Sequence, residues 1–327
     1  MKKFFASILV LAMMMTMVFS DAALAEDKKL SVVTTIFPIY DWVHQIVGDQ
    51  DYVEITMLLD NGTDLHSYQP TALDIMKVSE ADLFIYVGGE SDEWVDGVLA
   101  TAMNPNLASI NLVEAMGDAI KAEEIVEGME HEHEHEEEHE HEHEHEEEEF
   151  DEHVWLSLRN AEALCKVIAE ELSRIDPAGS ASYQANLAAY NVKLAALDQA
   201  YTEAVDAAQY KTVLFADRFP FRYLTDDYGL TYFAAFSGCS AESEASFQTI
   251  VFLAQKVDEL DLPAVLTIEH PKARIAETVV STTEAKNAKI LSMDSLQSVT
   301  AQDVQTGVTY LSVMESNLAV LREALNK

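Results

Sequence analysis

The sequence is poor in basic residues. Its 327 residues include 58 Asp and Glu but only 20 Lys and Arg, which gives a formal net charge of −38. Proteins that bind nucleic acid need clustered cations to displace phosphate counterions, and anionic membrane surfaces likewise attract basic segments. The composition therefore excludes nucleic acid as a partner and argues against electrostatic docking on an anionic membrane.

Cysteine and the common hydrolase motifs are also scarce. The two cysteines, Cys165 and Cys239, cannot make a four-cysteine zinc site. They lie in different halves of the chain, so we expect them to be unpaired and to pack as small apolar side chains. No helix with a His-Glu-x-x-His motif is predicted, and no Gly-x-Ser-x-Gly nucleophile elbow occurs.

Long apolar runs are missing after the N-terminus, so the mature chain has no predicted membrane-spanning helix. At the N-terminus, Lys2 and Lys3 precede an apolar run from Phe4 to Phe19, and Ala23-Leu24-Ala25 is a small-x-small cleavage signal. This pattern predicts a signal peptide over residues 1–25 and export to the periplasm or cell envelope. An uncleaved membrane anchor is the alternative. No cysteine lies near the cleavage point, so the sequence does not support an N-terminal lipid anchor.

The rest of the chain predicts an α/β protein with two similar lobes. Short apolar or β-branched runs alternate with helical patterns, which implies a mostly parallel sheet with right-handed crossovers in each half. The predicted strands are Leu30–Ile36, Val53–Leu59, Ala81–Val87, Leu107–Leu112, Thr212–Ala216, Thr231–Phe236, Ala264–Ile268 and Ala288–Met293. The predicted domains are a first lobe over 26–175, a linking helix over 176–208 and a second lobe over 209–327.

The linking helix is predicted to be long and rigid. Asp176 and Pro177 form a helix-start signal, with a capping residue followed by proline in the first turn. One apolar stripe recurs at helical spacing and consists of Leu187, Tyr190, Leu194, Leu197, Tyr201 and Val205. Two shorter helices broken near Gly179 are the alternative.

Three histidines outside the charged tract stand where binding groups collect in parallel sheets. His66 follows the second predicted strand, His270 follows the seventh, and His153 lies in Asp151-Glu152-His153. Ligands bind at the carboxyl ends of parallel strands, and imidazole with carboxylate suits zinc and other late first-row ions. His44 lies within a predicted helix, where a packing or surface role is expected.

Several motifs in order resemble a known family. They are Val33-Thr34-Thr35-Ile36-Phe37-Pro38, Gly62-Thr63-Asp64-Leu65-His66-Ser67-Tyr68-Gln69-Pro70, Asp151-Glu152-His153-Val154-Trp155-Leu156 and Tyr228-Gly229-Leu230. Together they are similar to the zinc- and manganese-binding solute receptors of bacterial ABC importers, cluster A-I, over nearly all of the mature chain. The resemblance implies two lobes bridged by a rigid helix and a monomer that delivers its metal to a membrane permease.

The resemblance also implies the metal site. It makes His66 and His153 ligands from the first lobe, and the histidine-rich loop favours Zn²⁺ as the cargo, with Mn²⁺ possible. Zinc receptors of this family usually have a third histidine after the first strand of the second lobe, where this chain has Arg218. Arginine cannot ligate a cation because it has no acceptor and stays protonated.

Three residues are candidates to replace that third ligand. The adjacent Asp217 is favoured, and His270 and Glu244 are alternatives. Arg218 is then expected to pair with a nearby acid and so to orient a ligand. Two histidines with carboxylates would bind zinc but discriminate weakly against manganese.

The tract from Glu130 to Glu149 contains thirteen Glu and seven His and has no apolar side chain to bury. It is predicted to be a disordered loop that gathers metal through many weak sites. A pH-sensitive element and a simple spacer are the alternatives. Its histidines are His131, His133, His135, His139, His141, His143 and His145.

The sequence thus favours a zinc receptor that performs no chemistry. A secreted zinc metallohydrolase is one alternative, with His66 and His153 on zinc and Glu269 or Glu244 as general base. A zinc buffer or adhesin without transport is another.

Overall fold

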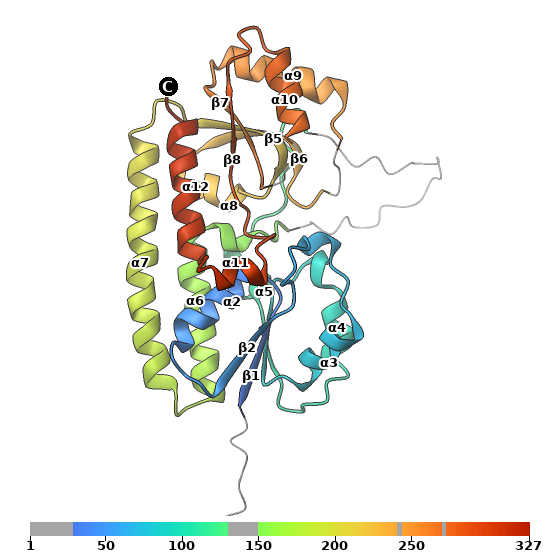
Figure 1. Ribbon diagram of the computed structural model, residues 1–327, viewed down its shortest axis with the longest axis vertical. Helices are drawn as coiled ribbons and strands as arrows, with labels where there is room; N and C mark the ends of the chain where they lie inside the picture. The colour runs from blue at the N-terminus through green and yellow to red at the C-terminus, as the bar shows by residue number, and fades with distance from the viewer. Residues whose placement is uncertain (1–28, 130–149, 241–243, 270–272) are drawn as a thin grey trace, which may run out of the picture.

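The computed structural model describes residues 29–129, 150–240, 244–269 and 273–327. These residues form two lobes, each built on a four-stranded parallel sheet, as predicted (Figure 1). All eight predicted strands are present, with ends that differ by at most three residues. The predicted signal peptide and the tract 130–149 lie outside the described residues.

The first lobe has the strand order β2-β1-β3-β4. Its central strand β3 is buried at every position, as expected for a parallel sheet that is covered on both faces. The elements are β1 Leu30–Thr34, α2 Phe37–Val47, β2 Val53–Met57, η1 Leu65–Ser67, α3 Ala72–Glu80, β3 Leu83–Tyr86, η2 Glu90–Asp92, α4 Trp94–Leu99, β4 Ala108–Asn111, α5 Leu112–Met116, η3 Gly117–Ala119, η4 Val154–Leu156 and α6 Leu158–Ile175.

The second lobe repeats this order as β6-β5-β7-β8, so β5 and β7 occupy the places of β1 and β3. Its elements are β5 Thr212–Phe219, α8 Arg222–Tyr228, β6 Thr231–Ser237, α9 Phe247–Glu259, β7 Ala264–Thr267, α10 Arg274–Thr282, β8 Lys289–Ser292, α11 Ala301–Gln305 and α12 Tyr310–Ala324.

The long helix α7, Ser180–Asp206, runs along both lobes (Figure 1). Its 27 residues give a length of about 40 Å. Every residue of the predicted apolar stripe is buried. The start of the helix differs from the prediction: Asp176 ends α6, and its carboxylate accepts hydrogen bonds from the hydroxyls of Tyr52 and Tyr183. A turn at 176–179 therefore separates α6 from α7.

The C-terminal segment also crosses between the lobes. After β8 it passes back to the first lobe, where Thr300 forms an isolated bridge with Asn61 and the Ala301 N–H donates to the Asp60 carbonyl at 2.7 Å. Helix α12 then runs beside α7 (Figure 1), and the buried Tyr310 hydroxyl donates to the Trp155 carbonyl at 2.7 Å. Two long helices and this return crossing therefore join the lobes.

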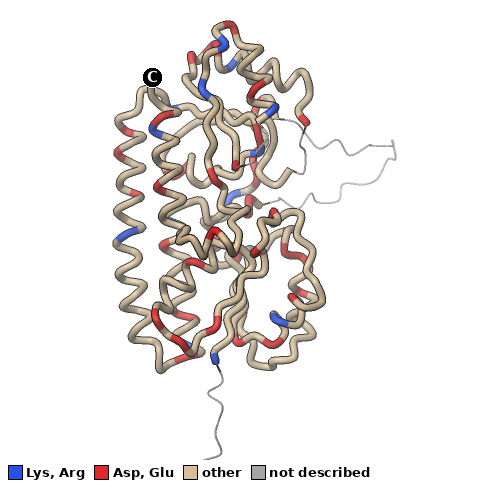
Figure 2. The backbone as a smooth tube through the Cα atoms, in the orientation of Figure 1, with Lys and Arg blue, Asp and Glu red and all other residues tan. Residues whose placement is uncertain are grey.

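Asp and Glu positions are spread along the backbone of both lobes, whereas Lys and Arg positions are few (Figure 2). Within the described residues, no helix combines the length and apolar character needed to cross a bilayer.

The burial of α7 predicts where the fold is most sensitive. Leu194→Ala removes a fully buried side chain, so we expect a loss of about 2–5 kcal/mol in the free energy of unfolding. Val192→Ala is the matched control on the same helix; its side chain is 70% exposed, and its effect should stay within about 0.5 kcal/mol. Urea unfolding measures both, and equal losses would contradict the burial of this stripe.

Candidate metal centre

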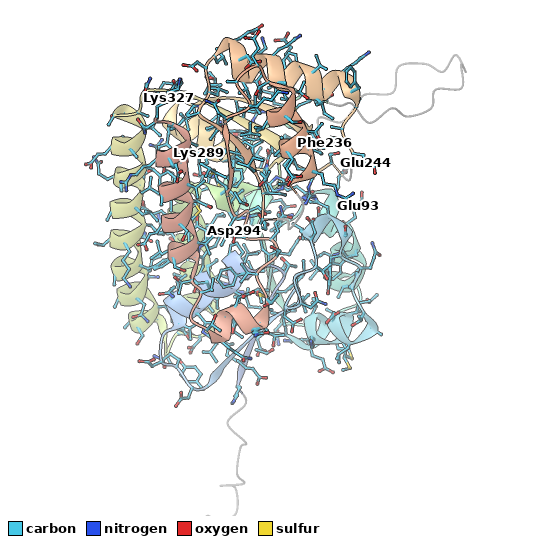
Figure 3. All side chains as sticks on the ribbon, turned by 45° about the horizontal axis from the view of Figure 1, so that its top comes forward. Glu93, Phe236, Glu244, Lys289, Asp294 and Lys327 are labelled. Carbon is cyan, nitrogen blue, oxygen red and sulfur yellow. The ribbon has the colours of Figure 1, made fainter. Side chains whose placement is uncertain are left out.

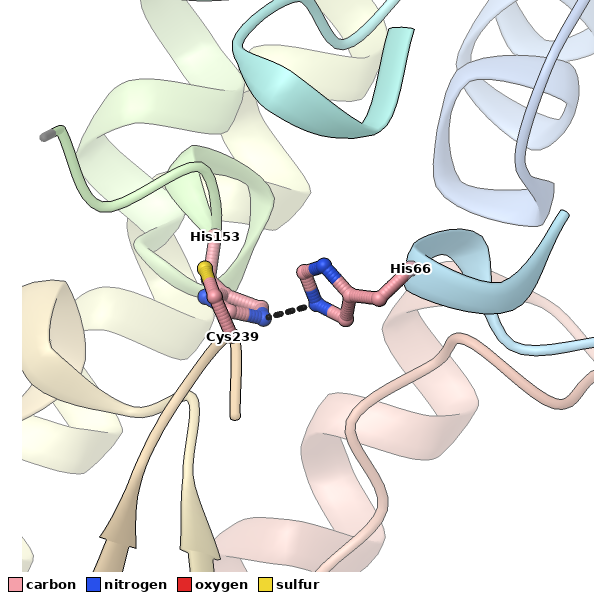
Figure 4. Close-up of side chains that lie close together, drawn as sticks. All are labelled: His66, His153 and Cys239. Atoms are coloured by element: carbon pink, nitrogen blue, oxygen red, sulfur yellow. Dashed lines mark hydrogen bonds between the residues drawn. The ribbon is translucent and has the colours of Figure 1, made fainter. Parts of the chain in front are cut away.

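Two histidines of the first lobe meet close to the second lobe. His66 lies in η1 after β2, and its N–H donates to the carboxylate of Asp64, which caps this short helix. His153 directly precedes η4 and is fully buried. The rings approach each other until their Nε2 atoms are 3.2 Å apart (Figure 4).

The ring of His153 is oriented by a carboxylate. Its Nδ1 lies 3.0 Å from Asp151 Oδ1, which also accepts the His153 backbone N–H at 2.8 Å. An ionised carboxylate can only accept, so Nδ1 carries the proton and Nε2 presents a lone pair. On the other ring, His66 Nδ1 lies 2.8 Å from the Ser91 hydroxyl.

The separation of the two Nε2 atoms suits a metal. Two nitrogens bound to one tetrahedral zinc at 2.0–2.1 Å lie about 3.3–3.4 Å apart. The observed separation of 3.2 Å between the two Nε2 atoms is close to this value. If both nitrogens present lone pairs, their contact is repulsive unless a proton or a cation lies between them.

A third potential ligand atom comes from the second lobe. One ligand atom from each of His66, His153 and Cys239 lies within 4.8 Å of those of the other two (Figure 4). Cys239 follows β6 by two residues, after Gly238. A Cβ atom at Gly238 would stand 2.9 Å from Cε1 of His153, so glycine lets this loop pass close to the ring.

The surroundings set the protonation of these groups. Burial, followed by the neighbouring His153, lowers the pKa of His66 to about 3, which keeps its imidazole neutral. Burial and then the charge of Glu123 raise the pKa of the Cys239 thiol far above its usual range. A bound cation supplies the charge that would stabilise the thiolate.

Asp217 is not part of this group. Its carboxylate accepts the backbone N–H groups of Arg218 at 2.9 Å and Ile268 at 3.3 Å. Asp217 and Arg218 both lie within β5, at the irregularity where its register with β6 shifts between Phe215 and Arg218. The Asp217 carboxylate therefore binds backbone groups of β5 and of the segment that follows β7.

The other predicted ligands are spread out. Glu244 is exposed and lies at the outer edge of the molecule (Figure 3). His270 and the seven tract histidines lie outside the described residues. His44 is exposed on α2, with its ring against Tyr40 at 4.5 Å.

Arg218 of the second lobe pairs with an acid of the first lobe. Its Nη2 lies 2.5 Å from Oδ2 of Asp64, the residue that caps the helix carrying His66. Burial acts to raise the pKa of Asp64, but the hydrogen bond and charge of Arg218 outweigh burial and hold this pKa below its usual range. The expected acid partner of Arg218 is therefore Asp64.

Sequence reasoning missed Cys239 as a candidate ligand. No spacing rule connects residue 239 with residues 66 and 153, because the three meet only through the packing of two lobes. The available signal was its place just after a predicted strand, the same criterion that selected His66 and His270.

Comparison with known proteins identifies the family. The family model described as the periplasmic component A of the zinc-uptake complex matches residues 32–324. The chain belongs to this family. Its members are solute-binding receptors rather than enzymes.

Individual relatives agree with this assignment. The zinc-binding lipoprotein AdcA of Streptococcus pneumoniae is 32% identical over 92% of this chain, and the zinc uptake protein ZnuA of Bacillus subtilis is 29% identical over 92%. The match spans 57% of AdcA and 89% of ZnuA, so the chain covers little more than half of the streptococcal relative. The Zn(II)-bound ZnuA-like domain of AdcA superposes with a TM-score of 0.71 at 30% identity, covering 91% of this chain and all of that domain.

The pair of Arg218 and Asp64 predicts a pH dependence. The folded pKa of Asp64 is lowered, so the pair stabilises the fold above the unfolded pKa of about 3.9 and loses this contribution as the pH falls through the folded value. Arg218→Gln should cost about 1–3 kcal/mol of unfolding free energy at neutral pH. The difference from the parent chain should shrink below about pH 4.

Chemical denaturation between pH 3 and pH 8 measures this difference. Arg174→Gln is the matched control, because its exposed pair with Glu171 should leave stability unchanged throughout. A deficit of Arg218→Gln that stays constant down to pH 3 would contradict the assignment to Asp64.

Proposed function

We propose that this protein is an extracytoplasmic receptor that captures Zn²⁺ between its two lobes and delivers it to the permease of an ABC importer. The observation that carries the proposal is the approach of two imidazole Nε2 atoms to 3.2 Å with a thiol within reach. Membership of a zinc-uptake family supports the same conclusion.

The cargo would be held by His66, His153 and Cys239. This set replaces the two histidines with Asp217 that the sequence favours. A thiolate is a softer ligand than a carboxylate, so the site should prefer zinc and discriminate more strongly against manganese.

A metallohydrolase finds less support in the site. Its general base would have to face a zinc-bound water. The two carboxylate oxygens of Glu269 accept the Ser295 N–H at 2.7 Å and the Ser295 hydroxyl at 2.5 Å, and Glu244 is exposed outside the cluster. Storage or adhesion would use the same zinc site without a permease, so zinc uptake by cells that lack only this protein separates those roles from transport.

The ligand assignment predicts how zinc affinity responds to substitution. In a chain lacking residues 130–149, calorimetry should find one tight zinc equivalent. His66→Ala, His153→Ala and Cys239→Ala should each weaken zinc by more than the roughly 10- to 100-fold that follows loss of an outer hydrogen-bond partner. Asp217→Asn is the matched control and should keep the parent affinity.

One further measurement sharpens this test. Manganese should compete poorly in the parent chain and better in Cys239→Asp, where a carboxylate replaces the thiolate. Retained affinity in Cys239→Ala together with loss in Asp217→Asn would restore the carboxylate assignment.

We also propose that the tract 130–149 gathers zinc for this site. The tract rejoins the described chain at Phe150, three residues before His153, and Phe150 forms an isolated bridge with Ala122. Alternating histidine and glutamate would offer many weak, exchangeable sites.

Deleting residues 130–149 should remove several weak zinc equivalents and keep the tight one. Calorimetric titration of the full chain and the deleted chain gives both stoichiometries. Replacing the seven tract histidines with glutamine, at unchanged length, is the control for shortening the loop. Loss of the tight equivalent in the deleted chain would mean that the tract itself supplies a ligand.

A further inference from the structure

The loop between β3 and α4 connects the two candidate histidine ligands through one serine. The Ser91 hydroxyl lies 2.8 Å from Nδ1 of His66 and donates to Oε2 of Glu152 at 2.5 Å. The Ser91 backbone N–H donates to the other oxygen of the same carboxylate at 3.0 Å. Glu152 directly precedes His153 in the chain.

The chemistry of these groups gives the link a direction. An ionised carboxylate only accepts hydrogen bonds, so the single hydroxyl proton of Ser91 points to Glu152. The serine oxygen then has only lone pairs for His66, and Nδ1 must carry the proton. The lone pair of His66 is therefore on Nε2, the atom that faces His153.

The surrounding backbone holds this arrangement closely. Glu152 is buried, and a Cβ atom at Gly89 would stand 2.3 Å from its carboxylate oxygen. Gly89 has a φ of +71°, so glycine is favoured there for conformation as well as for space. Asp92 anchors the same turn by accepting the N–H groups of Val87 at 2.9 Å and Gly88 at 3.0 Å.

We propose that Ser91 and Glu152 are positioning residues that hold His66 in the tautomer protonated on Nδ1, so that Nε2 is ready to bind the metal. The effect of this tautomer on zinc affinity rests on the proposed zinc-binding function. His153 has a carboxylate directly on Nδ1, whereas the Glu152 oxygen is 3.8 Å from Nδ1 of His66. The Ser91 hydroxyl bridges that gap, so each ligand histidine has an anionic partner, which fixes the ring and raises its basicity.

Zinc affinity provides the first test. Ser91→Ala should weaken the tight site about 10- to 100-fold without abolishing it. Glu152→Gln should weaken it as well, because an amide has one acceptor oxygen for two donors. Ser91→Thr keeps the hydroxyl and should restore most of the affinity. Ser79→Ala is the matched control, since this buried serine of the same lobe accepts the Met103 N–H and contacts neither histidine.

The tautomer itself provides the second test and requires no zinc. Nitrogen-15 chemical shifts of the zinc-free protein should show His66 protonated on Nδ1 in the parent chain, in Ser91→Thr and in Ser79→Ala. Ser91→Ala should lose that state. An unchanged tautomer in Ser91→Ala, or the same zinc affinity as in Ser79→Ala, overturns the proposal.

The two tests separate this proposal from the proposed function. A parent chain with the expected tautomer that binds no zinc would refute the receptor function and leave the hydrogen-bonded link standing. If the parent chain and Ser91→Ala bind zinc equally tightly, the receptor function stands and the positioning role of Ser91 is refuted.

Discussion

The approach of two imidazole nitrogens is the constraint around which this molecule is organised. His153 is fully buried, the side chain of His66 is 10% exposed, and their Nε2 atoms lie 3.2 Å apart. Two lone pairs at this distance repel each other, and the imidazole of His66 resists protonation because it is buried. The fold must therefore fix the orientation of both rings through contacts at their other nitrogen, Nδ1. Asp151 does so for one ring, and Ser91 with Glu152 for the other.

The two-lobed frame explains how such a contact is maintained. Both sheets have the same strand order, and the loops after β2, β3 and β6 and the end of β5 bring residues together where the two lobes meet. Helices α7 and α12 and the crossing at Thr300 join the lobes at several points, so a wide hinge motion would have to break buried contacts such as that of Tyr310 with Trp155. We therefore expect structural changes on metal binding to be confined to the loops that carry the proposed ligands.

The sequence predicted much of this frame because its signals are local. Strand and helix periodicity located all eight strands and the buried stripe of α7, and motif order pointed to His66 and His153. The start of α7 was predicted wrongly because Asp176 carries a capping signal but is held by two tyrosines instead. Cys239 escaped prediction because its partners come from the other lobe. Asp217 was favoured because it is next to Arg218 in the chain, whereas the sequence does not reveal that its carboxylate accepts the backbone N–H groups of Arg218 and Ile268.

The exchange at Arg218 can be understood as a redistribution of charge. The resemblance to zinc receptors places a neutral histidine there, whereas this chain has a cation, which would repel a metal ion if it were unpaired. Asp64 compensates that charge at 2.5 Å and at the same time caps the helix carrying His66. Under the proposed assignment, the lost donor comes from the segment after β6, where Cys239 lies close to the two imidazoles. When a cation is bound, its thiolate would add a negative charge there. A ligand set of this kind keeps three donors, becomes softer and favours zinc over manganese.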